Sequence, residues 1–255
     1  MTEPADAAVD AAEEAVRREE LAANLAEVRE RIAAAERAAG RPAGDVTLIV
    51  VTKTWPASDV RLLAGLGVGD VGENRDQEAL PKHEACADLG LRWHFIGQLQ
   101  RNKARHVAAY ADVVQSVDRP ELVAALDRAA AGAGRTLDVL LQIGLAAVPD
   151  GAPPAHRGGA DPADVASLAD LVEAAESLRL AGVMAVAPLG PDGSPADPRA
   201  SFARLADVAA GLRADHPRAT MVSAGMSGDL EEAVAAGATH VRVGTAVLGG
   251  RPRLR

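Results

Sequence analysis

The chain has 255 residues, of which 48% are hydrophobic and only 2% aromatic, so aliphatic side chains must build its core. A formal net charge of −9 argues against a nucleic-acid or anionic-membrane surface, and a single cysteine excludes a disulfide framework. No apolar run approaches the length of a membrane span and no secretory signal pattern opens the sequence, so we expect a cytoplasmic protein.

The first 18 residues are rich in alanine, glutamate and aspartate. We expect this acidic segment, residues 1–18, to be disordered and separate from one folded domain at residues 19–255. An amphipathic helix is predicted over about residues 19–39, because apolar residues recur at helical spacing from Leu21 to Ile32 and Gly40 ends the pattern.

After that helix, apolar runs typical of strands alternate with segments of helical pattern. Strands are predicted at residues 46–53, 70–72, 92–97, 112–117, 137–144, 180–187, 220–224 and 240–244. Helices are predicted between them, at about residues 57–66, 74–89, 100–109, 119–131, 162–178, 197–213 and 228–236.

This alternation predicts an α/β fold with a parallel sheet, and most of the strands are apolar on both faces, as buried parallel strands are. Eight units in a chain of this length favour a single (β/α)₈ TIM barrel with an additional N-terminal helix. A doubly wound open sheet is the alternative, although no Gly-x-Gly-x-x-Gly follows the first strand. Two Pro/Gly-rich loops, residues 146–160 and 189–198, follow strands on the edge where barrel active sites lie.

Lysine is scarce in this chain: Lys53, Lys82 and Lys103 are the only ones, and the other 24 of the 27 basic residues are arginines. Lys53 ends the first predicted strand, where a buried segment reaches the barrel edge. A lysine in such a place can keep a neutral, nucleophilic amine, which arginine cannot. Lys53 is therefore a candidate to form a Schiff base with a carbonyl ligand.

Small, Gly-rich turns follow the seventh and eighth predicted strands, at residues 223–229 and 244–250. Backbone N–H groups in such turns suit an anion, and Ser227 and Thr245 add hydroxyl donors. The loops after strands 7 and 8 are a frequent phosphate site in barrels. Ordinary strand-to-helix turns with Ser and Thr caps remain the alternative.

Arg242 interrupts the apolar eighth strand and is predicted to point into the barrel mouth. It is either one half of an ion pair with an inward carboxylate or a fixed cation that faces a ligand. His94, within an apolar strand, is by default a hydrogen-bonded core histidine, and Glu73 with Asn74 is by default a helix cap pair. The six histidines show no spacing typical of metal ligands, so no metal site is predicted.

Several segments, taken in order, resemble one family. They are Lys53 in Val-Thr-Lys-Thr, Gly-Glu-Asn at 72–74, Trp-His-Phe-Ile-Gly at 93–97, Gly-Met-Ser at 225–227 and Val-Arg-Val-Gly-Thr at 241–245. Together they resemble the pyridoxal phosphate homeostasis proteins, which share the alanine racemase N-terminal barrel. The match runs from about residue 20 to residue 251.

The resemblance implies a pyridoxal 5′-phosphate (PLP) cofactor held as a Schiff base on Lys53. It implies that Arg242 faces the pyridine nitrogen and that Asn74 lines the pocket. Phosphate contacts are implied for Ser223, Met226, Ser227, Gly244 and Thr245. The chain departs from the family pattern at Val71, Arg75 and Ala224, and at Arg157, where the family often has a lysine.

On this basis the chain is expected to serve PLP homeostasis, by buffering and delivery, without robust catalytic turnover. A PLP-dependent racemase-like enzyme is the alternative, and an unrelated barrel enzyme for a phosphorylated substrate is a third reading. The only tyrosine, Tyr110, is predicted away from the mouth, and an arginine beside the pyridine nitrogen disfavours protonation of that nitrogen. We expect a monomer whose partners are PLP and PLP-dependent apoenzymes, with no nucleic acid and no membrane.

Overall fold

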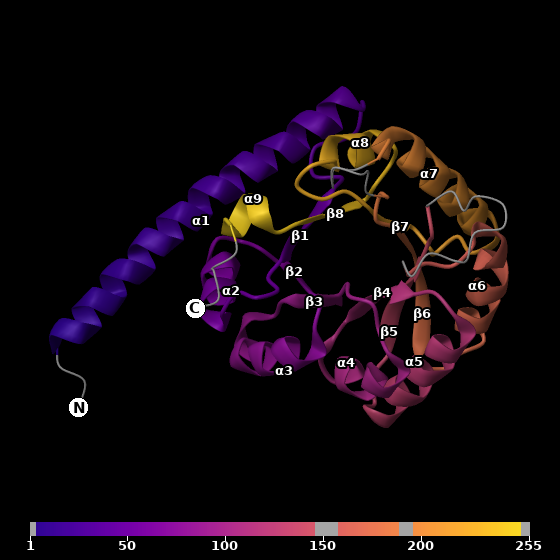
Figure 1. The fold of residues 1–255 in the computed structure, drawn as a ribbon, viewed down its shortest axis with the longest axis horizontal. Coiled ribbons are helices and arrows are strands. Elements are labelled where there is room, and N and C mark those ends of the chain that lie inside the picture. Colours follow the sequence, from indigo (N-terminus) through magenta and orange to yellow (C-terminus); the bar gives the residue numbers. More distant parts are fainter. Residues whose placement is uncertain (1–3, 146–157, 189–195, 251–255) are drawn as a thin grey trace.

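Eight parallel strands follow one another in sequence order and close into a barrel (Figure 1). The computed structural model describes residues 4–145, 158–188 and 196–250. The strands are β1 Thr47–Val51, β2 Asp70–Glu73, β3 Arg92–Phe95, β4 Val113–Val117, β5 Leu137–Gln142, β6 Leu178–Met184, β7 Met221–Ser223 and β8 His240–Val243. Parallel pairing of β1 with β8, from Thr47 opposite His240 to Val50 opposite Val243, closes the ring. The predicted barrel is confirmed, and the open sheet is excluded.

Helices surround the ring of strands on its outside (Figure 1). They are α2 Ala57–Gly65, α3 Asp76–Ala85, α4 Ala104–Tyr110, α5 Pro120–Gly132, α6 Val165–Glu173, α7 Pro198–Asp215, α8 Leu230–Ala235 and α9 Thr245–Leu248, with 3₁₀ turns at η1 Ala87–Leu89, η2 Arg101–Lys103 and η3 Pro162–Asp164. The helix predicted at 74–89 is shorter than expected, because α3 ends at Ala85 and a 3₁₀ turn follows. Most of the two Pro/Gly-rich loops, residues 146–157 and 189–195, lies outside the described residues.

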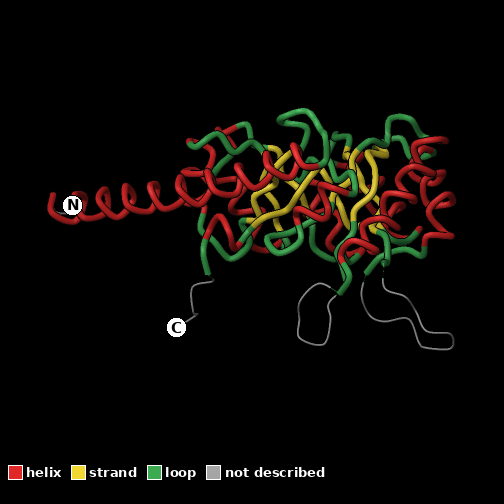
Figure 2. The backbone as a smooth tube through the Cα atoms, turned by 90° about the horizontal axis from the view of Figure 1, so that it is seen from above, coloured by secondary structure: helices red, strands yellow, loops and turns green. Residues whose placement is uncertain are grey.

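The N-terminal helix α1 begins at Pro4 and runs to Ala38, so its predicted start near residue 19 was wrong. Alanine and glutamate have high helix propensity, which explains why the acidic segment continues the helix rather than ending it. The early part of α1 extends well away from the barrel (Figure 2). Whether residues 1–18 act as a unit apart from the barrel domain stays a prediction.

The later part of α1 packs on the barrel through the predicted apolar stripe, in which Leu21, Leu25, Val28 and Ile32 are 0–5% exposed. This stripe faces α2, α8 and α9, which are the first and the last helices of the barrel. Arg17 of α1 connects the first and the last helix of the barrel, since its guanidinium lies 2.8 Å from Asp59 in α2 and 3.0 Å from the Leu248 carbonyl oxygen in α9.

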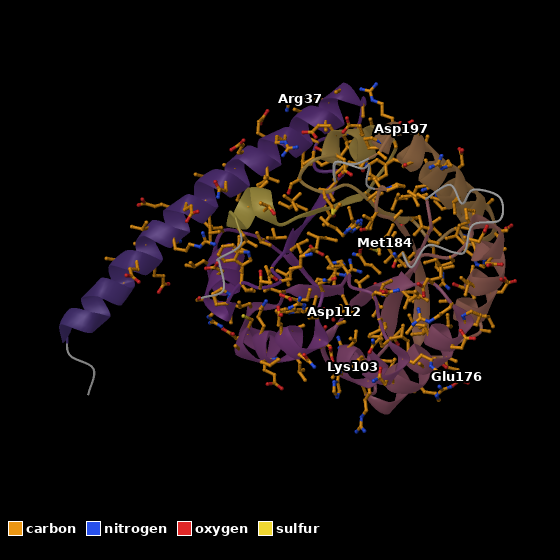
Figure 3. All side chains as sticks on the ribbon, in the orientation of Figure 1. Arg37, Lys103, Asp112, Glu176, Met184 and Asp197 are labelled. Carbon is orange, nitrogen blue, oxygen red and sulfur yellow. The ribbon has the colours of Figure 1, made fainter. Side chains whose placement is uncertain are left out.

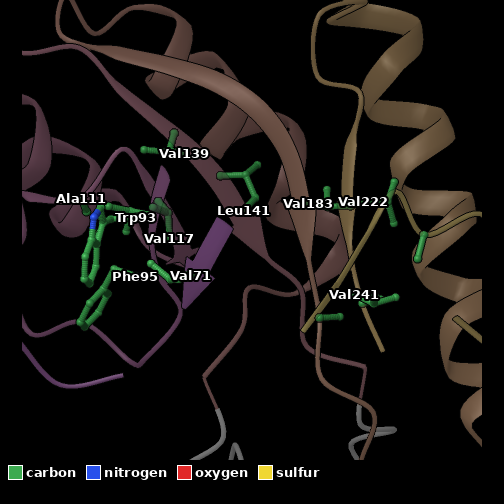
Figure 4. Close-up of a cluster of buried hydrophobic side chains, with 14 of the residues drawn as sticks. Val71, Trp93, Phe95, Ala111, Val117, Val139, Leu141, Val183, Val222 and Val241 are labelled. Carbon is green, nitrogen blue, oxygen red and sulfur yellow. The ribbon is translucent and has the colours of Figure 1, made fainter. Parts of the chain in front are cut away.

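The core has two layers because successive strand residues point to opposite faces of the sheet. Between the strands and the helices lies the larger layer, which includes Val71, Trp93, Phe95, Leu141 and Val222 (Figure 4). Inside the barrel lies a small apolar cluster of Val113, Leu140, Ala181, Met184 and Met221. Figure 3 shows Met184 within the ring, whereas Arg37 and Glu176 lie at the periphery. Other inward positions of the strands carry polar side chains.

Among the described residues, no helix combines the length and the apolarity that crossing a bilayer requires.

Candidate functional site

The carboxyl ends of β1, β2, β7 and β8 meet at one edge of the barrel. The Thr52 amide donates to the Gly72 carbonyl over 3.0 Å, and the Arg242 amide donates to the Gly225 carbonyl over 2.9 Å. A Cβ on Gly244 would lie 3.2 Å from the Val51 carbonyl oxygen, so the ends of β8 and β1 are in close contact. The structure therefore brings together the segments that carry the predicted site residues.

Lys53 lies directly beyond β1 and is half-buried. The next residue, Thr54, has φ +69°, a left-handed conformation that is strained for a β-branched side chain. The Thr54 amide donates to Glu78 Oε2 over 3.2 Å, which helps to hold this conformation. The chain thus turns sharply away from the sheet immediately after the candidate lysine. Asn74, the other predicted residue on this side, lies beyond β2 and is also half-buried.

A buried ionic cluster lies beside Lys53. Lys82 of α3 places its Nζ 2.6 Å from Glu73 Oε1 and 2.8 Å from the Thr52 carbonyl oxygen. The Thr52 hydroxyl donates to the same Glu73 oxygen over 2.6 Å. Burial raises the pKa of Glu73, and the opposing attraction of Lys82 is not enough to cancel that effect. Glu73 is therefore not the helix cap predicted from the sequence but an anchor for the residue before Lys53.

Arg242 is 3% exposed, and its side chain lies inside the barrel. Its Nη1 donates to the Ser223 hydroxyl oxygen over 2.6 Å, and its Nη2 donates to the Ala185 carbonyl over 2.8 Å. Burial lowers the pKa of Arg242 to about 10, with a smaller opposing effect of Asp229, so the guanidinium stays charged at neutral pH. Within the described residues the hydrogen-bond acceptors of Arg242 are neutral oxygens, so the contacting carboxylate that we considered is not found there.

The turn after β7 is tightly specified. Gly225 has φ +88°, and a Cβ at this position would lie 2.7 Å from the Ala233 Cβ, so the turn requires glycine. The Met226 amide donates to Asp229 Oδ1 over 2.6 Å, and the Ser227 carbonyl accepts from Arg31 over 3.0 Å. Asp229 is 1% exposed, and its burial raises the pKa of its carboxyl group.

The turn after β8 opens directly into the four-residue helix α9. Gly244 precedes this helix, and Thr245 is its first residue and is exposed. The first amides of a helix have no acceptor within that helix, so they are oriented toward the end of β8. The predicted phosphate residues Ser227, Gly244 and Thr245 thus lie in the two turns at the same edge as Lys53 and Asn74.

The structure places Ser223 differently from the other predicted phosphate contacts. Ser223 is fully buried in β7; its hydroxyl accepts from Arg242 and donates to Gln115 Oε1 over 2.7 Å. The Ser223 hydroxyl hydrogen is therefore used inside the barrel, and the Met226 amide is likewise engaged by Asp229.

His94 is the hydrogen-bonded core histidine that the sequence predicted, bonded to Asp70 and Gln115. Sequence reasoning missed Lys82 and Gln115, and Arg157 lies outside the described residues.

Comparison with known proteins identifies the family of this chain. The family model described as "Alanine racemase, N-terminal domain" matches residues 19–252. The chain is 43% identical over 258 residues to the pyridoxal phosphate homeostasis protein of Mycobacterium tuberculosis, a match that covers 94% of this chain and 95% of that protein. The chain belongs to the pyridoxal phosphate homeostasis protein family. The Escherichia coli protein of the same name is 37% identical over 242 residues, covering 91% of this chain and 97% of that protein.

Among solved structures, one relative of the family was determined with the cofactor. The structure of PipY of Synechococcus elongatus PCC7942 with PLP bound matches with a TM-score of 0.73 and 36% identity. The match covers 90% of this chain and 100% of that chain.

Proposed function

We propose that this chain binds PLP in the barrel mouth and serves intracellular PLP homeostasis by holding and delivering the cofactor. The observation that carries the proposal is the meeting of a half-buried lysine, a buried cation and two tight turns at one barrel edge. The PLP-bound relative, which this chain matches along the whole of that relative's length, supports the same ligand.

The residues at this edge fit a phosphorylated pyridine aldehyde. PLP supplies the reactive aldehyde, and the Lys53 amine would bond to its carbon as a Schiff base with loss of one water. Arg242 would face the pyridine ring, and Asn74 would line the pocket. Ser227, Gly244 and Thr245 offer the anion site for the phosphate. Ser223 and Met226 are the less suitable phosphate donors, because their donor groups are engaged within the protein.

The arrangement favours holding PLP over turning over amino acids. An arginine carries donors alone, so a protonated Arg242 cannot stabilise a protonated pyridine nitrogen as a carboxylate would. The single tyrosine, Tyr110, is fully buried in α4 against Trp93 and His83, on the outer side of the sheet. Burial raises the pKa of Tyr110, which makes it unfit to exchange protons with a ligand. We further propose that the protein is a cytoplasmic monomer that supplies PLP-dependent apoenzymes.

The test is an absorbance spectrum after PLP addition and desalting. Wild-type protein is expected to retain an absorbance band of lysine-bound PLP, and Lys53→Ala is expected to lose it while remaining folded. Lys53→Arg keeps the positive charge but cannot form the bond, so it is expected to behave like Lys53→Ala. Lys103→Ala is the matched control, because Lys103 pairs with Asp76 at 3.3 Å in a different segment.

Two results would count against the proposal. A band that persists in Lys53→Ala would place PLP on another amine, and no band in wild-type protein would favour a different phosphorylated ligand. Incubation of the PLP-loaded protein with single amino-acid enantiomers then separates a carrier from a racemase, because steady production of the opposite enantiomer would contradict a role in holding and delivery alone.

A further inference from the structure

A continuous chain of buried polar side chains crosses the barrel interior. It starts at Arg242 in β8 and passes through Ser223 in β7, Gln115 in β4 and His94 in β3 to Asp70 at the start of β2. The four hydrogen bonds measure 2.6, 2.7, 2.9 and 2.8 Å in that order. The first four side chains are 0–3% exposed, and the Asp70 side chain is 20% exposed at the far end of the barrel.

The two ends of this hydrogen-bond chain and the placement of the Gln115 amide atoms fix the direction of every hydrogen bond in it. A guanidinium only donates and a carboxylate only accepts. The Ser223 oxygen therefore accepts from Arg242, and its hydroxyl hydrogen goes to Gln115 Oε1. The Gln115 amide then donates to His94 Nδ1, and His94 Nε2–H donates to Asp70. All four donors point from Arg242 toward Asp70, and this order requires a neutral His94 with its hydrogen on Nε2.

The charges around His94 agree with that requirement. Burial lowers the pKa of His94, and Asp70 raises it by less. His240 of β8, whose ring lies 6.4 Å from that of His94, has its pKa lowered to about 4 by burial, so it too is neutral at pH 7. Arg92 and Asp112 act on His94 in opposite directions. At Asp70, burial raises the pKa, whereas the His94 hydrogen bond and the charge of Arg92 lower it, and the pKa lies below its ordinary value.

We propose that Gln115 and His94 are positioning residues that hold the Arg242 guanidinium in the place where it faces the ring of bound PLP. This inference rests on the proposed function, since it assigns Arg242 to that ring. The Ser223 hydroxyl accepts from Arg242, and its own hydrogen, which would otherwise be buried without a partner, is accepted by Gln115 Oε1, so Gln115 fixes the rotation of the hydroxyl. Gln115 keeps its oxygen toward Ser223 because its amide is required by His94 Nδ1. The orientation of Arg242 is thus set by Gln115 and His94, which lie two and three hydrogen-bonded side chains away from it.

The sharpest test of this positioning role replaces the Gln115 amide donor that faces His94 Nδ1 by an acceptor. Gln115→Glu keeps an acceptor for Ser223 but places a carboxyl oxygen against His94 Nδ1, and this contact requires one added proton. His94, which would then lie between two carboxyl groups, is the group expected to carry that proton. In protein without PLP, ¹⁵N-histidine NMR at pH 7 is expected to show a neutral His94 with the Nε2–H tautomer in wild type and a charged His94 in Gln115→Glu. A purely structural role for Gln115 does not predict this change.

The consequence for the ligand is measured in parallel. Gln115→Leu and Ser223→Ala remove bonds of the chain, and each is expected to raise the PLP dissociation constant about tenfold or more and to shift the absorbance maximum of bound PLP. Ser116→Ala is the matched control, because Ser116 is the neighbour of Gln115 in β4 and its buried hydroxyl has no hydrogen-bond partner among the described residues. It is expected to leave both quantities unchanged.

The outcomes separate this inference from the proposed function. An Nδ1–H tautomer in wild type, or PLP affinity and spectrum unchanged in Gln115→Leu and Ser223→Ala, would overturn the positioning role. Failure of wild-type protein to retain PLP would overturn the proposed function, while the His94 spectra would still decide whether the chain has the proposed direction. If Gln115→Leu does not fold, the PLP affinity of Ser223→Ala and the charge of His94 in Gln115→Glu decide whether the positioning role holds.

Discussion

Replacement of Lys82 by methionine would leave Glu73 buried without its cation. The side chains of Lys82 and Glu73 are 7% and 0% exposed, and Nζ lies 2.6 Å from Oε1. Methionine keeps the length and most of the apolar contact of the lysine stem. The change therefore removes the ammonium group with little loss of packing, and the Thr52 hydroxyl becomes the remaining donor to Glu73. A buried carboxylate in this position is expected to take up a proton.

The magnitude follows from linkage. Burial raises the pKa of Glu73 even with Lys82 present, and loss of Lys82 removes the main influence that lowers it. An unfolded glutamate titrates near pH 4.3, about 2.7 units below neutral. At about 1.36 kcal/mol per unit, a glutamate that stays protonated in a folded protein at pH 7 costs at most roughly 3.7 kcal/mol. That value agrees with the roughly 3–5 kcal/mol typical of a buried pair that loses one partner.

The pH dependence has a definite sign. A group whose folded-state pKa is raised contributes most stability below its unfolded pKa and loses it as the pH rises. The deficit of Lys82→Met relative to wild type should therefore be smaller at pH 5 than at pH 7. Urea unfolding at pH 5 and pH 7 measures the free energy of unfolding of both proteins. Lys103→Met, which breaks a partly exposed pair with Asp76, is the control and should cost less than about 1 kcal/mol at either pH. Equal deficits for Lys82→Met at the two pH values would refute the reasoning.

Three further substitutions test other parts of the fold by the same unfolding assay. Thr54→Gly relieves the left-handed backbone at φ +69° and is expected to stabilise the protein by about 0.5–1 kcal/mol; a loss of stability would show that Thr54 is not strained. Gly182→Ala would place a Cβ 1.9 Å from the Met221 carbonyl oxygen in the neighbouring strand, and a cost below about 3 kcal/mol would contradict that close approach. Leu25→Ala on α1 should cost about 2–5 kcal/mol, whereas Val16→Ala, at a position 68% exposed, should change stability by less than about 0.5 kcal/mol.

The fold could be predicted because its signals are local and repeated. Most strands are short runs that are apolar on both faces, and each strand is followed by a helical pattern, so the order of elements alone indicated a barrel. The start of α1 could not be predicted in the same way. An Ala/Glu-rich stretch is equally compatible with a solvated helix and with a disordered segment, and no residue in it marks a boundary.

The site was predictable where one residue in one strand carried the signal, as with Lys53 and Arg242. Lys82 was missed because it reaches Glu73 from a separate helix, and helical spacing gives no hint of a contact with the preceding strand. Gln115 did leave a signal, since it is a large polar residue among the valines of its strand, as His94 is a polar residue between Trp93 and Phe95. Considering such residues as one inward-facing set, rather than one strand at a time, would have found the polar chain.

The contacts of α1 with the first and the last helices of the barrel bear on the order in which the protein can fold during synthesis. The hydrogen bond from Arg17 to Leu248 joins residues 231 positions apart, and Asn24 bonds to Val247 across a similar interval. A chain that emerges from the ribosome from its N-terminus makes α1 first, but the helix α9 against which it packs is made last. The apolar stripe of α1 must therefore wait for nearly the whole chain to be synthesised before it can be buried, which leaves it open to chaperones or to premature contacts throughout translation.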